Sequence, residues 1–233
     1  MKKNLKILII IALVFQSCEK EDDLISQNCE TDCTEIVGKL MTDDGTTPIA
    51  NRKITVVWDN TSSGFGTVRT KASARTDSNG DFNISFFMRD DELESGIHRM
   101  YFDELNENEF LRSDLNGMPS IPSVRDTMVI RNHNVVKKAF VNLTLLNLDD
   151  IQGSDRFWTN FDYPRPVGFS QSIDGQIRGW TNEFESNQVL EIAGNQEIII
   201  EIVRKIDGIT TTENETLFVE AGTTLNYTVD FNN

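Results

Sequence analysis

From Thr34 onward the chain is a series of short runs rich in Val, Ile, Thr and Phe, separated by clusters of Gly, Asn and Asp. No long stretch repeats its apolar residues at helical spacing. Short apolar runs bounded by turn-forming residues are typical of strands, and many in succession indicate β-sandwiches. Hydrophobic residues make up 38% of the chain, which is enough for a packed core. We therefore expect an all-β protein.

The first half contains six runs that predict strands, and residues 106–122, rich in Gly and Pro, are expected to form a long loop. The six expected strands are 36–41, 53–58, 68–75, 81–88, 97–103 and 127–131. After a polar stretch at 132–138 a second series begins, at 139–146, 156–161, 176–180, 188–192, 197–205, 215–219 and 224–231. We expect two tandem sandwiches, 34–133 and 134–233, the second immunoglobulin-like. The alternative is that 139–146 completes the first sandwich.

The N-terminus has the order of a secretory signal peptide, in which basic residues precede an apolar run and a small residue. The apolar run, 7–15, is far shorter than the about 20 residues that a transmembrane helix needs. Ser17 and Cys18 follow it. This stretch resembles a bacterial lipobox, although Phe15 and Gln16 depart from the usual residues. The resemblance implies cleavage of 1–17 and lipidation, with palmitate, of Cys18; the alternative is a free Cys18 in an uncleaved anchor.

The residues after the cysteine, Glu19-Lys20-Glu21-Asp22-Asp23, resemble the export signal of Bacteroidetes-type surface lipoproteins. That resemblance implies a lipid-anchored protein on the outer face of the outer membrane. The alternative is a plain solvated acidic segment. In either case we expect residues 18–33 to form a hydrated acidic tether.

Acidic residues outnumber basic ones throughout the chain. The formal net charge is −15, and removal of residues 1–17, which contain three lysines and no acids, moves it to −18. Nucleic acid is therefore an unfavourable partner, because its phosphates carry the same sign of charge. We expect the membrane to be reached through lipid alone.

Two cysteines remain once Cys18 is lipidated. Cys29 and Cys33 enclose three residues, and in an oxidising compartment they form a disulfide if a turn brings their Cα atoms to roughly 4.4–6.8 Å. We predict this disulfide, with two free thiols as the alternative. A zinc site is disfavoured because zinc usually takes four ligands.

Two turns in the first half carry a family resemblance. The chain runs from Gly38-Lys39-Leu40 to a turn ending in Pro48-Ile49-Ala50, and later through 76–82 with the sequence TDSNGDF. The pattern is similar to that of carboxypeptidase regulatory-like, or transthyretin-like, domains. In the second turn Asn79 and Gly80 supply the positive φ angles of a tight hairpin. The resemblance covers about 34–131 and implies a fold, not an activity.

The sequence contains no motif that predicts catalysis, a metal site or a cofactor. His98 and His133, the two histidines, are expected to be surface or strand residues. Asp77, Asn79 and Asp81 alternate as calcium ligands do, but Met88 stands where an EF-hand needs Glu, so a hairpin turn is expected. Adjacent acids such as 90–91 and 149–150 are expected to be solvated.

An aromatic cluster at 157–180 is the remaining candidate site. Exposed rings would form a platform for a sugar or a protein, and Trp158, Tyr163 and Trp180 are its candidates. Core packing, with Phe157 and Phe161 inward, is the favoured interpretation. We expect a non-catalytic cell-surface lipoprotein that serves as a spacer, adhesin or binding accessory for protein or glycan. A hydrolase with an unrecognised carboxylate site is the alternative.

Overall fold

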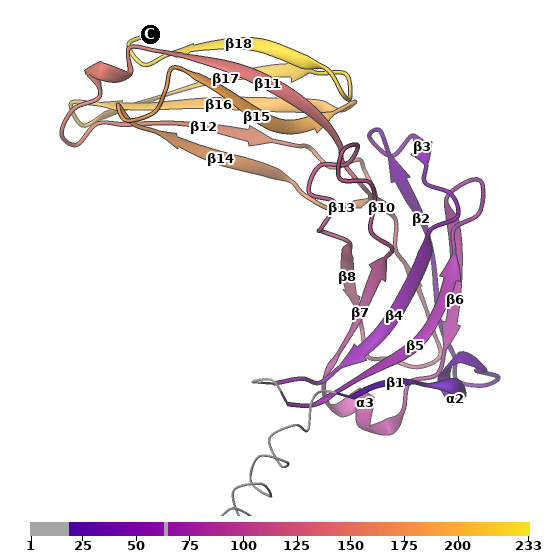
Figure 1. Cartoon of the computed structure of the whole chain (residues 1–233). Helices are drawn as coiled ribbons and strands as arrows, with labels where there is room; N and C mark the ends of the chain where they lie inside the picture. The colour runs from indigo at the N-terminus through magenta and orange to yellow at the C-terminus, as the bar shows by residue number, and fades with distance from the viewer. Residues whose placement is uncertain (1–18, 63–64) are drawn as a thin grey trace, which may run out of the picture.

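The computed structural model describes residues 19–62 and 65–233, with side chains from Asp23 onward. The expected signal peptide 1–17 and lipidation site Cys18 lie outside the described residues. The chain is all-β, as the strand and turn pattern predicted. Two sandwiches follow one another along the chain, and Figure 1 shows them joined end to end with a bend between them.

The first sandwich packs two sheets against each other. One sheet has the order β1-β5-β4-β7-β8, and the other is built on β2, which pairs with β3, β6, β9 and β10. Two short helices, α2 (Leu24–Gln27) and α3 (Asp90–Glu94), lie at the end far from the second sandwich (Figure 1). The strands are β1 (Glu19–Asp22), β2 (Thr34–Thr42), β3 (Thr47–Pro48), β4 (Lys53–Asp59), β5 (Thr67–Arg75), β6 (Asp81–Phe86), β7 (Ile97–Phe102), β8 (Gly117–Ile121), β9 (Thr127–Ile130) and β10 (His133–Asn134).

Alternating residues of these strands build the first core. Ile54 and Val56 of β4 are fully buried, and Ile84 and Phe86 of β6 are buried from the opposite sheet. Because successive side chains of a strand point to opposite faces, every second residue enters the core.

Strand β8 corrects the expectation of an unbroken loop over 106–122. Residues Gly117–Ile121 pair antiparallel with β7. Pro119 argued against a strand because proline has no N–H for the ladder, but β8 lies at the edge of its sheet, where one side of the strand needs no partner.

The second sandwich has the sheets β15-β11-β18 and β14-β12-β16-β17. Strand β11 pairs with β15 and β18, so residues 139–146 belong to this sandwich and do not complete the first. Its core includes Ile198, Ile200 and Ile202, which alternate along β16. The elements are β11 (Lys137–Leu146), the 3-10 turn η1 (Leu148–Asp150), β12 (Arg156–Asp162), β13 (Ser170–Gln171), β14 (Gly175–Trp180), β15 (Asn187–Gly194), β16 (Glu197–Ile206), β17 (Ile209–Phe218) and β18 (Thr224–Asp230).

Strand β17 is longer than the expected 215–219. It forms a hairpin with β16 through Asp207 and Gly208, both at positive φ, and residues 209–216 are exposed on both faces. A strand that buries neither face lacks the alternation by which a sequence reveals it. β17 is also the edge of its sheet.

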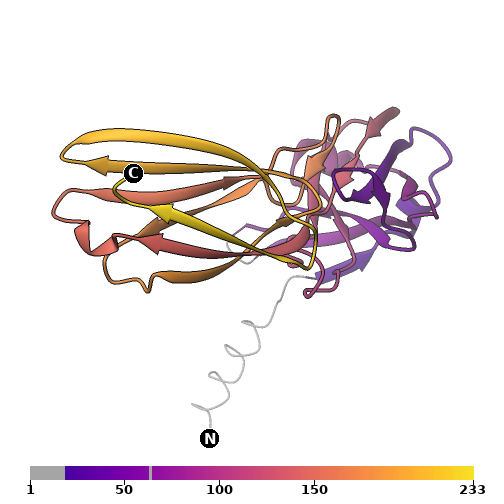
Figure 2. The same ribbon diagram turned by 90° about the horizontal axis from the view of Figure 1, so that it is seen from above.

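The two sandwiches meet at a joint that both halves of the chain build. Val135 belongs to the first core and Val136 to the second. Leu111, from the segment before β8, enters the second core, and its N–H donates to the carbonyl of Val136 at 2.9 Å. Conversely, β13 belongs to the second half of the chain and pairs with β10 of the first sandwich. Figure 2 shows the same end-to-end arrangement from above.

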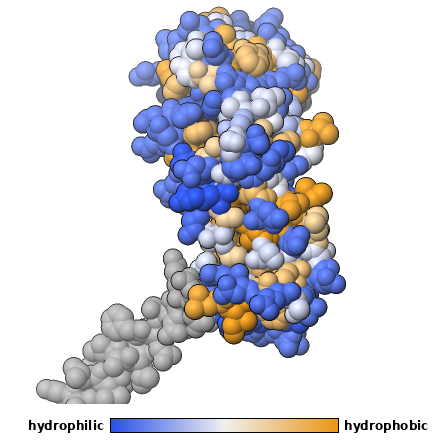
Figure 3. Space-filling model, turned by 90° about the vertical axis from the view of Figure 1, so that its right-hand side faces the viewer, coloured by the Kyte–Doolittle hydropathy of each residue, from blue (hydrophilic) through white to orange (hydrophobic). Residues whose placement is uncertain are grey.

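The surface carries small apolar patches within a mostly hydrophilic face (Figure 3). Met128 and Ile130 of β9 are 62% and 66% exposed. Isolated apolar side chains are ordinary on a protein surface and indicate no site by themselves.

Candidate functional site

The N-terminal segment packs onto the first sandwich, which contradicts the expected hydrated tether. Strand β1 pairs parallel with β5, setting Asp22 opposite Thr70, and the N–H of Asp23 donates to the carbonyl of Thr70 at 3.0 Å. The side chain of Asp23 is fully buried. An acidic run is typical of solvated chain, and the sequence did not reveal that a partner 48 residues away buries this acid.

Asp23 also begins helix α2. Its Oδ1 accepts a hydrogen bond from the N–H of Ser26 at 3.2 Å, as an N-cap does. The hydroxyl of Ser26 donates to the carbonyl of Phe87 at 2.6 Å. The turn after β1 is therefore fixed to the body of the sandwich.

Four charged side chains meet under this turn, and we call Asp23, Lys71, Arg89 and Glu92 the Lys71 cluster. Lys71 Nζ donates to Asp23 Oδ2 at 2.6 Å and to the two oxygens of Glu92 at 2.8 and 2.6 Å. Lys71, Asp23 and Glu92 have no exposed side-chain surface. All three donors of the ammonium group therefore meet carboxylate oxygens and none meets solvent.

Arginines complete the charge balance of the Lys71 cluster. Arg89, which is 36% exposed, donates from Nη2 to Asp23 Oδ1 at 2.8 Å. Its backbone N–H donates to Glu92 Oε2. Arg69 contacts Glu92 and Asp91 and lies 4.6 Å over the ring of Trp58. Each buried carboxylate thus has cationic partners, as charges removed from water require.

The two buried carboxyl groups are ionised. Burial alone would raise the pKa of Asp23, but hydrogen bonds from Arg89, Lys71 and Ser26 lower it to about 2. For Glu92, burial is again outweighed, by the neighbouring His98, Lys71 and the Arg89 amide, and the pKa falls to about 2. Neither carboxylate reaches solvent, so neither can act on an external substrate.

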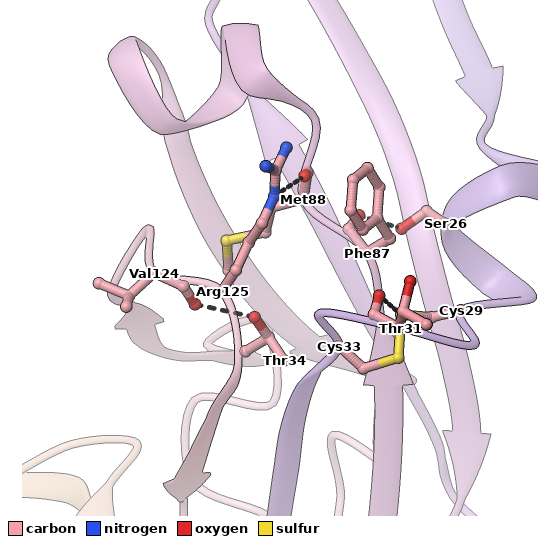
Figure 4. The surroundings of a disulfide bond; sticks show 9 residues. All are labelled: Ser26, Cys29, Thr31, Cys33, Thr34, Phe87, Met88, Val124 and Arg125. Atoms are coloured by element: carbon pink, nitrogen blue, oxygen red, sulfur yellow. Dashed lines mark hydrogen bonds between the residues drawn. A yellow bond between two sulfur atoms is a disulfide. The ribbon is translucent and has the colours of Figure 1, made fainter.

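A disulfide closes the segment that follows α2 (Figure 4). The structure joins Cys29 to Cys33, with Cα atoms 5.8 Å apart. Thr34, the first residue of β2, donates its hydroxyl to the carbonyl of Val124 at 2.8 Å, and Arg125 Nε donates to the carbonyl of Met88 at 2.6 Å. The disulfide-closed turn thus leads directly into the central strand β2.

The expected ligand platform does not exist in the structure. Tyr163 and Trp180 are 1% and 4% exposed, and both belong to the second core. Trp158 is half-buried on the opposite face of β12 from Phe157 and Phe161, as the core-packing interpretation predicted. The strands alternate, so the three candidate rings do not share an exposed face.

The other candidates have structural partners. Asp77 Oδ1 accepts from the amides of Asn79 and Asp81, which closes a turn between β5 and β6. The expected hairpin is wrong, because β5 and β6 belong to different sheets, and Gly80, but not Asn79, has a positive φ. His133 is a buried strand residue whose Nδ1 lies 2.8 Å from Ser170 Oγ, and burial lowers its pKa to about 4. Within residues 19–62 and 65–233, no group of three His, Cys, Asp or Glu side chains is placed to hold a metal ion.

Comparisons with known proteins identify no family. No family model and no curated protein matches the sequence. Shaft pilin SpaA from Lactobacillus rhamnosus GG is 8% identical, with a TM-score of 0.31 over 85% of this chain and 97% of that one. A streptococcal ancillary pilin is 9% identical, with a TM-score of 0.33 over 86% and 63%. The major pilin BcpA of Bacillus cereus is 8% identical, with a TM-score of 0.31 over 81% and 69%. Similarity this low supports no statement about function.

Among the residues that the structure describes, none of the helices has the length and apolar character needed to span a bilayer.

Proposed function

We propose that the protein is an exported bacterial lipoprotein of the Bacteroidetes surface type, held in the outer membrane by acyl chains on Cys18. The observation that supports this most is the position of β1. The strand begins at Glu19, next to Cys18 in the sequence, and lies at the end of the first sandwich remote from the second (Figure 1). A lipid at Cys18 would hold one end of an elongated molecule and leave the other end free.

In this arrangement the first sandwich serves as a base and the second as the displayed part. Because residues 19–33 pack onto the sandwich, the distance between lipid and protein is short. The protein acts as a non-catalytic spacer or binding accessory whose ligand, a protein or a glycan, meets the second sandwich. The proposal also includes that residues 34–131 form a carboxypeptidase regulatory-like domain.

Asp23 has a structural role, so the export signal must be tested without it. Lys20, Glu21 and Asp22 replaced by alanine should leave lipidation intact and abolish surface display, whereas Cys18→Ala should abolish lipidation. Labelled palmitate incorporation measures lipidation, and protease shaving of whole cells measures surface display.

Two outcomes would contradict the proposal. A wild-type protein that takes up no palmitate has no lipid anchor. A lipidated protein that resists shaving, while a known surface protein is digested, does not face outward.

Two acyl chains suffice for stable anchoring, because each buried CH₂ contributes about 0.8 kcal/mol.

A further inference from the structure

The amine of Lys71 and the carboxyl group of Asp23 lie in direct contact inside the first sandwich. The parallel register of β1 and β5 sets Asp22 opposite Thr70. The next residue after each of these, Asp23 and Lys71, therefore brings the carboxyl group and the amine together. Lys71 Nζ lies 2.6 Å from Asp23 Oδ2, and both side chains are fully buried. We propose that these side chains condense and that the folded protein carries an amide bond between Lys71 Nζ and Asp23 Cγ.

The two oxygens of the Asp23 carboxyl group have different hydrogen-bond partners. Its Oδ1 accepts from Arg89 Nη2 at 2.8 Å and from the N–H of Ser26 at 3.2 Å. Two donors on one oxygen stabilise the negative charge that develops there when a nucleophile adds to the carbon. The other oxygen, Oδ2, contacts the amine and is the one that leaves.

Glu92 is the acid–base group of the reaction. Its two oxygens lie 2.8 and 2.6 Å from Lys71 Nζ, within reach of the protons that the nitrogen must lose. The ammonium group first gives one proton to Oδ2, to which it is hydrogen-bonded at 2.6 Å, and this leaves a neutral amine facing a carboxylic acid. The amine then adds to Cγ, and the charge on Oδ1 is held by Arg89 and Ser26.

The second half of the reaction expels water. Glu92 transfers another proton from the nitrogen to Oδ2, the Cγ–Oδ2 bond breaks, and water departs as the carbonyl re-forms. One ammonium and one carboxylate become one amide and one water, without oxidation or reduction. Glu92 returns to its starting state.

Burial favours the amide. Orientation by the fold replaces the encounter of two free groups, which makes such a reaction effectively unimolecular. The product also removes two opposite charges from a site where each charge has lost its hydration. Glu92 and Arg89 remain as a balanced pair. The inference concerns the folded chain and does not depend on lipidation.

Peptide mass spectrometry of the purified full-length protein tests the proposal. Trypsin cuts after Lys20, Lys39, Arg69 and Arg75, and it does not cut after an acylated Lys71. We expect peptides 21–39 and 70–75 to appear joined, at their summed mass less one water molecule, with fragment ions that place the link at Asp23 and Lys71. Separate peptides, with cleavage after Lys71, would overturn the proposal.

Two variants test the role of Glu92. Glu92→Gln retains the size of the side chain and loses its ability to carry protons, so we expect an unlinked protein. Asp91→Asn is the matched control, because Asp91 lies on the same helix, is 55% exposed and pairs with Arg69; its link should form fully. Circular dichroism checks the fold of each. A linked Glu92→Gln variant would refute the assignment of Glu92, and the wild-type measurement decides the bond itself even if that variant does not fold.

Discussion

The side-chain amide of Asn195 donates to Asp43 Oδ1 at 2.9 Å across the joint between the two sandwiches, although 152 residues separate the pair. Lys137 Nζ contacts the other carboxylate oxygen of Asp43 at 3.0 Å. One residue of the β2–β3 turn therefore holds the start of β11 and the β15–β16 turn together.

This contact predicts that Asp43 fixes the angle between the sandwiches. Asp43→Gly should widen the distribution of distances between spin labels placed one on each sandwich, because charge-assisted hydrogen bonds are lost. Glycine is chosen because Asp43 and its neighbour Asp44 both have positive φ, at 51° and 57°. Asp44→Gly is therefore the matched control. Equal distributions for the two variants would contradict the prediction.

The buried imidazole of His133 predicts an acid-sensitive joint. Its pKa falls from 6.5 to about 4 on burial, so the unfolded chain takes up a proton in this range that the folded chain does not. Folding stability should therefore decrease as pH falls, by about 1.6 kcal/mol between pH 6.5 and 5. Urea unfolding at several pH values measures this slope, and His133→Gln should flatten it. An unchanged slope in the variant would assign the effect to other groups.

The Lys71 cluster predicts that replacing Lys71 alone lowers the free energy of unfolding more than replacing Lys71, Asp23 and Glu92 together with apolar residues. Lys71→Met leaves two carboxylates buried without their ammonium partner and should cost about 3–5 kcal/mol. The triple variant with Asp23→Leu and Glu92→Leu added should recover most of that loss, because apolar groups need no partner. Both variants lack the proposed amide, so the comparison is unaffected by it. Chemical denaturation measures the free energy of unfolding, and a triple variant less stable than Lys71→Met would contradict the argument.

The position of the aromatic rings predicts opposite consequences for two tryptophans. Trp180 is buried and donates from Nε1 to Thr159 Oγ1, so Trp180→Ala should cost about 3–5 kcal/mol of stability. Trp158→Ala should cost clearly less, because its ring is half-buried. Denaturation of both variants gives the difference. Equal losses would place Trp158 in the core as well.

The strands were predictable where a single face is buried. The alternation in Ile198, Ile200 and Ile202 indicates β16 directly, and the Asn79-Gly80 pair indicates the turn between β5 and β6. Strands at sheet edges escaped prediction for two different reasons: β8 contains a proline, and β17 buries neither face.

The candidate site could not be found from the sequence. Asp23, Lys71 and Glu92 come from an acidic run, a strand and a short helix, and none follows a known motif spacing. Their only local signal is a lysine within a strand pattern, at Lys71. The packing of the N-terminal segment could not be predicted for the same reason, since the partner that buries Asp23 is 48 residues away in the sequence. Local patterns predict strands, whereas ion pairs between distant strands depend on the sheet register.

The open edge of β17 bears on how copies of this protein behave side by side. An unpaired strand edge can template pairing with another chain, but this one carries Glu213 and Glu215. Parallel in-register pairing would stack each glutamate on its own copy, and antiparallel pairing centred on Asn214 would set Glu213 opposite Glu215. Repulsion between these carboxylates therefore opposes the pairing of two copies of the protein along β17.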